Sequence, residues 1–502
     1  MHWPVFFLTT VFILVFVVVT LLSPALSSRI LEAGKQATLA NFDWLLMISG
    51  NVFVVFCLSC IFLPVGRIRL GGASVTPEFS TLSWFAMLFA AGMGIGLMFW
   101  GVAEPMAHYT GWAGTPLNAA ANTPEGAETG MAAAIFHWGL HAWAIYAVVG
   151  LALAFFAYNK GMPLALRSVF YPILGERTWG WAGHTIDIIA VLATAIGLAT
   201  SLGLGARQVA SGFHFLFGTD SGLGTQLVVI SGVTLAAVFS VVRGLDRGVR
   251  VLSNLNLWLA LALLLFVFVV GPTAVIFKGL ATNVESYFSN ILSLSNWIDR
   301  NDGDWYRAWT VFYWAWWISW SPFVGAFIAR VSKGRTVREF IIAVLLLPTV
   351  VCAVWMSVFG TTAIYQAQGG VGQLANGLTD VSIAMFHMLD SLPLSSLTSI
   401  VSIILVVVFF VTSADSGALV ISIMTAGGVS DSTRRQHVFW ATMSGLVAAM
   451  LLVGGGAETL GALQSATIVA SLPFALLLLL MCGSVYLGLR AELQLLETAQ
   501  AR

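Results

Sequence analysis

Apolar stretches long enough to cross a lipid bilayer recur along the whole chain, for example at 5–22, 44–65 and 260–275. About 20 consecutive apolar residues make one membrane-spanning helix. Only helices and closed β-barrels satisfy their backbone groups in lipid, and barrel strands would alternate apolar with polar residues. Charged residues are 9% of the chain, whereas soluble proteins carry roughly 25%. The sequence therefore predicts an all-α polytopic membrane protein.

Twelve transmembrane helices are expected. They lie at about 4–24, 43–65, 80–103, 130–157, 184–214, 225–242, 251–277, 306–328, 339–362, 397–424, 436–453 and 462–488. Most of the 22 basic residues fall in the loops after even-numbered spans. The excess of basic residues in cytoplasmic loops then predicts a multi-pass protein of the inner (plasma) membrane with both termini in the cytoplasm. The formal net charge is zero, so no nucleic-acid partner is expected.

The eighth span is unusually rich in tryptophan, with five in the twelve residues from Trp309 to Trp320. Tryptophan normally gathers at the ends of a span, but this cluster continues to where the span is deepest. Stacked π faces attract cations, and aromatic cages bind quaternary ammonium groups in this way. Dense packing of large side chains is the simpler alternative. Five tryptophans at helical spacing favour the cage.

Two polar features suggest a cation site within the membrane. Gly92, Gly94 and Gly96 alternate in the third span, which predicts an unwound stretch with free carbonyl groups. Close helix packing through small residues is the alternative. Thr412 and Ser413 end the tenth span and offer hydroxyl ligands, although such hydroxyls commonly bond to carbonyls one turn earlier.

The other ionisable groups in the spans are functional candidates by default. They are Glu104, Asp187, Arg207 and Asp415. His137 and His141 have the i, i+4 spacing that can hold a metal on one helix face. This pair makes a membrane metalloenzyme an alternative of another class. Because no glutamate accompanies the pair in an HExxH arrangement, hydrogen-bonded structural histidines are favoured.

The segments 92–105, 137–146, 309–339 and 412–417 together resemble the betaine/choline/carnitine transporter family, and the resemblance covers essentially the whole chain. It implies two inverted five-helix repeats, at 80–278 and 306–490, after two extra helices in 1–79. An amphipathic surface helix and its connection would occupy 279–305, and a short cytoplasmic tail 491–502. The resemblance also implies a homotrimer, with contacts through the surface helix.

The resemblance further assigns roles to residues at matching motif positions. Its central cage consists of Trp138, Trp143, Tyr146 and Trp317, and its path toward the cytoplasm is lined by Phe312, Trp314, Trp316 and Trp320. One sodium site uses Ala90, Met93, Phe409, Thr412 and Ser413, and Met93 also borders the substrate. A second sodium site uses Thr194 and Phe323. Leu198 replaces a threonine expected there, so we expect nearer one sodium than two.

The resemblance also bears on the substrate. Choline-carrying members tend to have Asp where this chain has Gly96, and a zwitterion brings its own carboxylate. The expected activity is sodium-coupled import, by alternating access, of glycine betaine or dimethylsulfoniopropionate. An Asp at position 96 is expected to favour choline. Carnitine/precursor exchange and proton-coupled choline transport are the alternatives. Arg207 is expected to replace a coupling cation or to bind a substrate carboxylate. Enzymatic activity and cofactors other than the coupling sodium are not expected.

Overall fold

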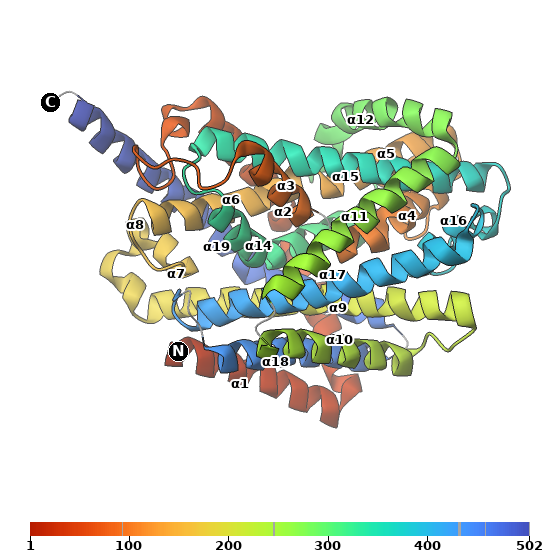
Figure 1. Ribbon diagram of the computed structural model, residues 1–502, viewed down its shortest axis with the longest axis horizontal. Helices are drawn as coiled ribbons and strands as arrows, with labels where there is room; N and C mark the ends of the chain where they lie inside the picture. The colour runs from red at the N-terminus through yellow and green to blue at the C-terminus, as the bar shows by residue number, and fades with distance from the viewer. Residues whose placement is uncertain (93, 244–245, 430–432, 457, 501–502) are drawn as a thin grey trace.

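The computed structural model describes residues 1–92, 94–243, 246–429, 433–456 and 458–500, without the side chains of 89–92, 246–252 and 499–500. Within these ranges every regular element is a helix, and the β-bridge between Arg69 and Thr336 is isolated (Figure 1). The all-α, multi-pass prediction is therefore confirmed. Ten helical segments are long and apolar enough to cross a membrane.

The long helices follow one another along most of the chain. They are α1 (Trp3–Leu22), α2 (Pro24–Phe62), α9 (Trp181–Phe217), α10 (Leu223–Arg243), α11 (Asp246–Val270), α12 (Thr273–Ser295), α14 (Phe312–Val331), α15 (Val337–Gln368), α17 (Ser395–Thr425), α18 (Arg434–Gly455) and α19 (Thr459–Gln500). Two predicted spans are split into helix pairs, α3 (Thr81–Gly92) with α4 (Ile95–Thr110), and α5 (Pro124–Trp138) with α6 (Leu140–Tyr158). Shorter helices are α7 (Leu166–Val169), α8 (Tyr171–Leu174), α13 (Gly303–Tyr306) and α16 (Ala384–Asp390).

Each of the twelve predicted spans contains one of these helices or helix pairs. Two of them lack the length or apolarity that marks the ten segments. The third span is split between α3 and α4, so neither piece has a full span's length. The eighth is α14, whose hydropathy is lowered by its tryptophans. Both exceptions surround the cavity described below.

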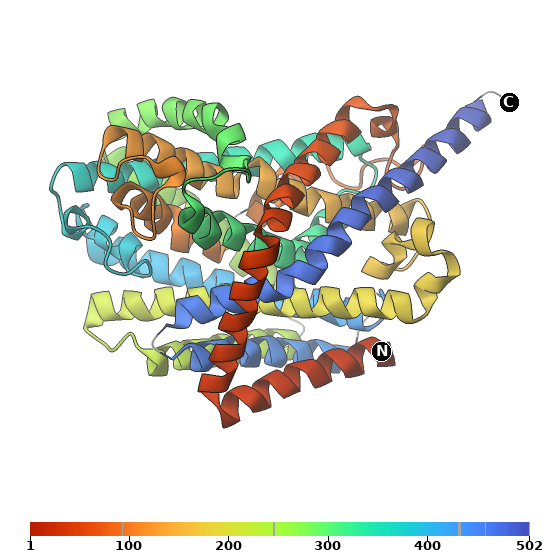
Figure 2. The same cartoon turned by 180° about the vertical axis from the view of Figure 1, so that it is seen from behind.

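The helices are stacked in layers, with most of them lying horizontally in Figure 1. α12 covers α5 and α15, α17 packs on α9, and α10 packs on α18 at the opposite side. α14 lies inside this stack against α6, α9 and α19. Figure 2 shows α2 and α19 crossing the back of the stack alongside each other. The tryptophan-rich helix is thus enclosed by protein on several sides.

Two of the predicted spans are interrupted near the centre of the stack. The third span breaks between Gly92 and Ile95, as the alternating glycines predicted, and Gly94 is extended (φ −167°, ψ −176°). The fourth span breaks at Gly139, which the sequence did not predict. A Cβ at Gly139 would lie 2.6 Å from the carbonyl oxygen of Ile135. The backbone N–H of Leu140, freed by this break, donates to Tyr287 Oη of α12 at 3.3 Å.

Several helices begin or end at other residues than the predicted segments do. α2 begins at Pro24 rather than near 43, because Ser23 caps it and proline suits a first turn. The seventh span ends at Val270 rather than near 277, because Gly271 and Pro272 interrupt it, so the surface helix starts at Thr273. The surface helix buries Ile276, Tyr287 and Leu294, whereas Phe288 and Leu292 are exposed. At the carboxyl end, the predicted tail continues as part of α19 up to Gln500.

An ion pair holds the connection between α12 and α14. Arg300 donates to both carboxylate oxygens of Asp302, at 2.8 and 2.7 Å, and its side chain also donates to carbonyl groups at the end of α12. Asp302 in turn accepts from the backbone N–H of Leu117 at 2.8 Å. Both charged side chains are buried, at 4% and 3% exposure. The pair therefore ties two loops to the start of the tryptophan-rich segment.

We predict that Asp302→Asn destabilises the protein by about 3 kcal/mol, because Arg300 would remain buried without its counter-charge. Asp299→Asn is the matched control, since Asp299 is exposed and asparagine tolerates its positive φ of 52°. Thermal unfolding in detergent measures both variants. Equal unfolding temperatures for the two variants would contradict the role given to this ion pair.

Candidate substrate-binding site

A cavity of about 290 Å³ lies where the two broken spans meet α9, α11, α14 and α17. Its wall contains apolar, aromatic and small hydroxyl side chains. The lining residues are Gly94, Ile95, Gly96, Trp138, Ala142, Trp143, Tyr146, Ser201, Ser253, Asn256, Leu257, Trp316, Trp317, Trp320, Phe323, Val324, Phe327, Phe409, Thr412, Ser413 and Ser416. All four predicted cage residues are among them.

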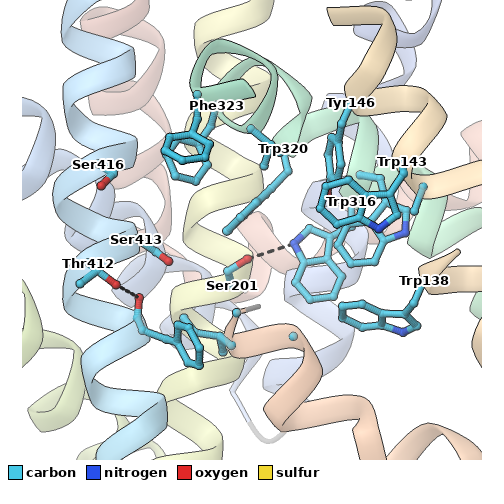
Figure 3. Close-up of a pocket in the computed structure, with 18 of the residues that line it drawn as sticks. Trp138, Trp143, Tyr146, Ser201, Trp316, Trp320, Phe323, Thr412, Ser413 and Ser416 are labelled. Atoms are coloured by element: carbon cyan, nitrogen blue, oxygen red, sulfur yellow. Dashed lines mark hydrogen bonds between the residues drawn. The ribbon is translucent and has the colours of Figure 1, made fainter. Parts of the chain in front are cut away.

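One wall of the cavity is aromatic (Figure 3). Trp316 and Trp317 stack with centroids 4.7 Å apart and planes 14° apart. Trp138 meets Trp317 edge to face at 4.8 Å, and Trp143 meets Tyr146 in the same way at 5.3 Å. None of these five side chains is more than 6% exposed. The rings therefore make a preformed, mostly dry aromatic surface.

Four indole N–H groups around the cavity donate hydrogen bonds to oxygen atoms. Each donates to a different partner: Trp138 to Glu104 Oε2 (2.9 Å), Trp316 to Ser201 Oγ (3.1 Å), Trp317 to the His137 carbonyl (2.8 Å) and Trp320 to the Gly197 carbonyl (2.8 Å). An aromatic ring is negative on its face and positive at its edge. Anchoring the positive N–H edges in this way leaves the ring faces available to a cation.

The facing wall is polar. Thr412, Ser413 and Ser416 project from α17 in Figure 3, and Ser201 lies between the two walls. Thr412 Oγ1 donates to the carbonyl groups of Val408 (2.9 Å) and Phe409 (3.1 Å), which leaves its lone pairs for another partner. The back-bonding alternative for this threonine and a role as an oxygen ligand are therefore compatible.

Asn256 of α11 is a lining residue that the sequence reasoning missed. Its side chain is 1% exposed, and neither its Oδ1 nor its Nδ2 has a hydrogen-bond partner within the described residues. A buried amide without partners is costly. A polar residue in an apolar span was the available signal, but the sequence did not show which side Asn256 faces. The cavity supplies the place where a bound molecule would satisfy it.

Some predicted site residues lie elsewhere. Trp314 points away from the cavity and stacks on His141 at 5.6 Å, because it is two residues from Trp316 and so on another helix face. Phe312 stacks on Trp316 at 5.7 Å but borders a different cavity, with Lys35 and Arg307.

The predicted sodium ligands are only partly brought together. Phe409, Thr412 and Ser413 line the cavity. Ala90 lies in the last turn of α3, just before the helix interruption, and Met93 is outside the described residues. At the second predicted site Phe323 lines the cavity, whereas Thr194 is buried and donates to the Ala190 carbonyl at 2.7 Å.

The two histidines of the fourth span diverge. His141 Nε2 lies 3.0 Å from Asn51 Oδ1, while His137 Nδ1 lies 2.5 Å from Glu104 Oε1. The i, i+4 pair therefore does not form one metal site. Glu104, His108 and His137 do bring possible ligand atoms within 4.8 Å of one another. Trp305 Nε1, however, donates to His108 Nδ1 at 3.1 Å, so these groups fit a hydrogen-bond network.

The other intramembrane charged residues do not line this cavity. Arg207 lies 3.4 Å from Asp380 in the segment before α16, so its predicted roles as a substitute cation or carboxylate partner receive no support from its position. Asp187 pairs with Arg167, and Asp415 pairs with His437 at 3.1 Å. These contacts link helices and loops rather than the cavity walls.

A second cavity of about 160 Å³ adjoins the first and shares Phe323, Phe327 and Ser416 with it. It continues to Arg330, near the end of α14, and to Leu164 and Met424. Arg330 belongs to the basic loops that predict the cytoplasmic side. The larger cavity therefore has a neighbouring space toward that side.

Membrane-spanning helices that break beside a central, partly polar cavity are the organisation of a secondary transporter. Comparison with known proteins gives the family. Residues 4–494 match the model of the betaine/carnitine/choline family of transporters. This chain belongs to that family, and it is a transporter rather than an enzyme.

Its relatives include several named carriers. Glycine betaine transporter 1 of Vibrio parahaemolyticus is 57% identical over 98% of this chain and 94% of its own. A glycine betaine/proline/choline/ectoine transporter of the same bacterium is 55% identical over 98% of this chain and 88% of its own. The glycine betaine transporter OpuD of Bacillus subtilis is 43% identical over 95% of this chain and 93% of its own.

The rings of the aromatic wall leave no room for a side chain at Gly96. A Cβ there would lie 2.4 Å from Trp138 Cη2 and 3.2 Å from Trp316 Cη2. The expectation that Asp at position 96 favours choline did not take the close approach of this position to the Trp138 ring into account. In the present arrangement an aspartate would have to displace the ring of Trp138 before it could meet a substrate.

We therefore predict that Gly96→Ala destabilises the protein by about 1–3 kcal/mol through overpacking against Trp138. Gly94→Ala is the matched control, because a Cβ there meets nothing within 4 Å and the backbone is extended. Thermal unfolding and the tryptophan fluorescence spectrum should change more for Gly96→Ala. Indistinguishable behaviour of the two variants would contradict the close approach of Gly96 and Trp138.

Proposed function

We propose that this chain imports a zwitterionic quaternary ammonium or sulfonium osmolyte, with glycine betaine first and dimethylsulfoniopropionate second, coupled to sodium. The observation that carries the proposal is the cavity with aromatic rings on one wall, hydroxyl groups on the other and the amide of Asn256 in its lining. An onium group suits the first wall, and a carboxylate suits the donors of the second. The printed names of the relatives agree, since each includes glycine betaine.

The polar wall supports a zwitterion over a plain cation. Asn256 Nδ2 lacks a partner within the described residues and can donate to a carboxylate, and Ser201 stands between the two walls. Among the side chains that the structure describes, none of Asp or Glu lines the cavity. A zwitterion brings a carboxylate for the polar wall, whereas choline offers a hydroxyl group there.

Sodium coupling is supported by the hard oxygen atoms on α17. Thr412 and Ser413 line the cavity together with Gly94 and the start of α4, where the interruption of the third span frees carbonyl groups. Leu198 packs against Gly417 of α17, because a Cβ at Gly417 would lie 2.6 Å from a methyl carbon of Leu198. This apolar contact supplies no ligand for a second sodium, so we propose a stoichiometry nearer one than two.

The proposed mechanism is alternating access, in a molecule of twelve spans that includes two inverted repeats. A two-fold relation between spans 3–7 and 8–12 requires that each contact between the two repeats has a counterpart in which the repeats have exchanged roles. α14 packs on α6 as α15 packs on α4, and α9 packs on α18 as α17 packs on α10. The adjoining cavity at Arg330 provides a release route toward the proposed cytoplasmic side.

We further propose a homotrimer in the cell inner membrane. Both termini lie toward the same end of the molecule, with α7 and α8, which suits an even number of crossings and cytoplasmic termini. α12 exposes large apolar side chains at Phe277, Phe288 and Leu292, which are 71%, 56% and 80% exposed. This exposed face supports a contact of α12 with a second copy or with lipid.

A binding screen tests the proposed substrate. Purified protein is titrated with glycine betaine, dimethylsulfoniopropionate, carnitine, choline and ectoine, each in sodium and in potassium buffer. The expected result is tightest binding of one of the first two compounds, and only in sodium. Preference for choline or carnitine without a sodium effect would favour proton-coupled choline transport or carnitine exchange.

Trp317→Leu is predicted to weaken glycine betaine binding by roughly 30-fold, because a desolvated cation–π contact of about 2 kcal/mol is lost. Trp314→Leu is the control, since this tryptophan lies on the same helix but outside the cavity. Titration of folded, monodisperse protein measures both affinities. If the Trp314 variant loses as much affinity as the Trp317 variant, the assignment of the aromatic wall is wrong.

Thr412→Val is predicted to raise the sodium concentration for half-maximal uptake by about tenfold, the effect of losing roughly 1.4 kcal/mol of ligand energy. Valine keeps the shape of threonine but removes the oxygen. Ser402→Ala is the control, because Ser402 is buried on the same helix and donates to the Thr398 carbonyl away from the cavity. Uptake in proteoliposomes as a function of sodium measures both. An unchanged sodium requirement in Thr412→Val would remove this residue from the sodium site.

A further inference from the structure

A buried carboxylate lies directly behind the aromatic wall. Glu104 of α4 is 0% exposed, and its Oε2 accepts the indole N–H of Trp138 at 2.9 Å and the hydroxyl of Tyr313 at 2.5 Å. Its Oε1 lies 3.3 Å from His108 Nε2 and 2.5 Å from His137 Nδ1. Four groups from three helices therefore converge on this carboxylate.

The partner of His108 fixes the hydrogen on that ring, and the partner of His137 is compatible with a hydrogen on its Nδ1. Trp305 Nε1 can only donate, so His108 Nδ1 accepts and the hydrogen of the neutral ring is on Nε2, toward Glu104. The Thr310 hydroxyl, 2.9 Å from His137 Nε2, finds its acceptor there when His137 is neutral and carries its hydrogen on Nδ1. Both histidines then donate to Glu104. Every group in the network is satisfied when Glu104 is an ionised carboxylate that accepts four hydrogen bonds.

This carboxylate has no cationic partner of its own within the part of the chain that the structure describes. Its ion-pair contacts there are only to His108 and His137. Arg300 lies on the far side of Trp305, 5.8 Å from its ring, and is paired with Asp302. An uncompensated charge in a low-dielectric interior is costly, and any nearby charge of opposite sign is attracted strongly. The network thus leaves one negative charge beside the cavity.

We propose that the onium group of the substrate is the missing counter-charge, and that Glu104 acts on it through Trp138. A charge-assisted hydrogen bond to a carboxylate is stronger than a neutral one and polarises the donor. Electron density pushed from the N–H edge into the indole makes the ring face in the cavity more negative. Glu104 is therefore a positioning residue that both orients Trp138 and strengthens its attraction for a cation. This inference rests on the proposed function and adds the source of its charge selectivity.

The test compares two ligands of the same shape in wild type and Glu104→Gln. One is glycine betaine, and the other is 3,3-dimethylbutanoate, in which carbon replaces the quaternary nitrogen. Both are titrated in sodium buffer. The preference for glycine betaine should fall by about tenfold or more in Glu104→Gln, which corresponds to about 1.4 kcal/mol. A purely structural role would weaken both ligands by the same factor, and an equal loss or no loss would overturn the proposal.

Tyr313→Phe is the matched control, because it removes a donor from the same carboxylate oxygen but keeps the charge. It should leave the preference within about threefold of wild type, roughly 0.7 kcal/mol. If the carbon analogue binds too weakly to measure, Trp138→Phe and its double variant with Glu104→Gln decide. If Glu104→Gln does not fold, Trp138→Phe alone decides. If Glu104 acts through Trp138, Trp138→Phe alone lowers the affinity for glycine betaine, and Glu104→Gln has no further effect on that affinity in the Trp138→Phe background. Additive effects of the two changes, or an unchanged affinity in Trp138→Phe, would overturn the link. Wild-type protein that binds no onium compound would instead reject the proposed function.

Discussion

The hydrogen bonds of four indole N–H groups determine what this cavity can bind. The N–H groups of Trp138, Trp317 and Trp320 donate to oxygen atoms on α4, α5 and α9 outside the cavity lining, and that of Trp316 donates to Ser201, which lines the cavity. If these groups turned inward, their positive edges would repel a cation. The anchors also hold large rings in one orientation without filling the space between them. The remaining features of the site depend on this arrangement.

Interrupted helices make the arrangement possible. Gly94 and Gly139 end regular helix beside the cavity, and this brings Gly96 close to Trp138 and lets α5 and α6 present Trp138 and Trp143 separately. Irregular backbone at membrane depth is tolerated where protein buries it or where it lines a cavity. Tyr287 of the surface helix α12 meets a backbone group freed at the second break. The outer layer of the molecule is therefore connected physically to the aromatic wall.

Much of the site was predictable from sequence because tryptophan clusters and alternating glycines are rare in a span. The positions of Trp316, Trp317 and Trp320 fit a helical period of 3.6, but Trp314 lies one turn before Trp317, so the period alone does not exclude it from the cavity. The break at Gly139 was not predictable, because a single glycine within an apolar run often remains helical. Glu104 was noticed as an intramembrane acid, but its contacts with His137 and Tyr313 join residues far apart in sequence. Such contacts depend on how helices pack, which local pattern does not specify.

The fold shows the same division between local and long-range information. Apolar runs predicted the helices, whereas the ends of α2 and α11 depended on individual capping and proline residues. The buried pair of Arg300 and Asp302 was equally hidden, although it fixes the entry into α14. Charged residues in this chain thus serve mainly to join elements, and Glu104 is the one placed directly behind the aromatic wall among the described side chains.

We propose that this aromatic and hydroxyl-lined cavity couples the transport of an onium zwitterion to sodium. Uptake of labelled glycine betaine into proteoliposomes under an inward sodium gradient tests it most directly, with equal potassium on both sides as the comparison. We expect glycine betaine to accumulate above its external concentration when the sodium gradient is present. We expect no accumulation when potassium replaces sodium or when the sodium concentration is equal on both sides. Equal accumulation in sodium-free buffer would contradict it.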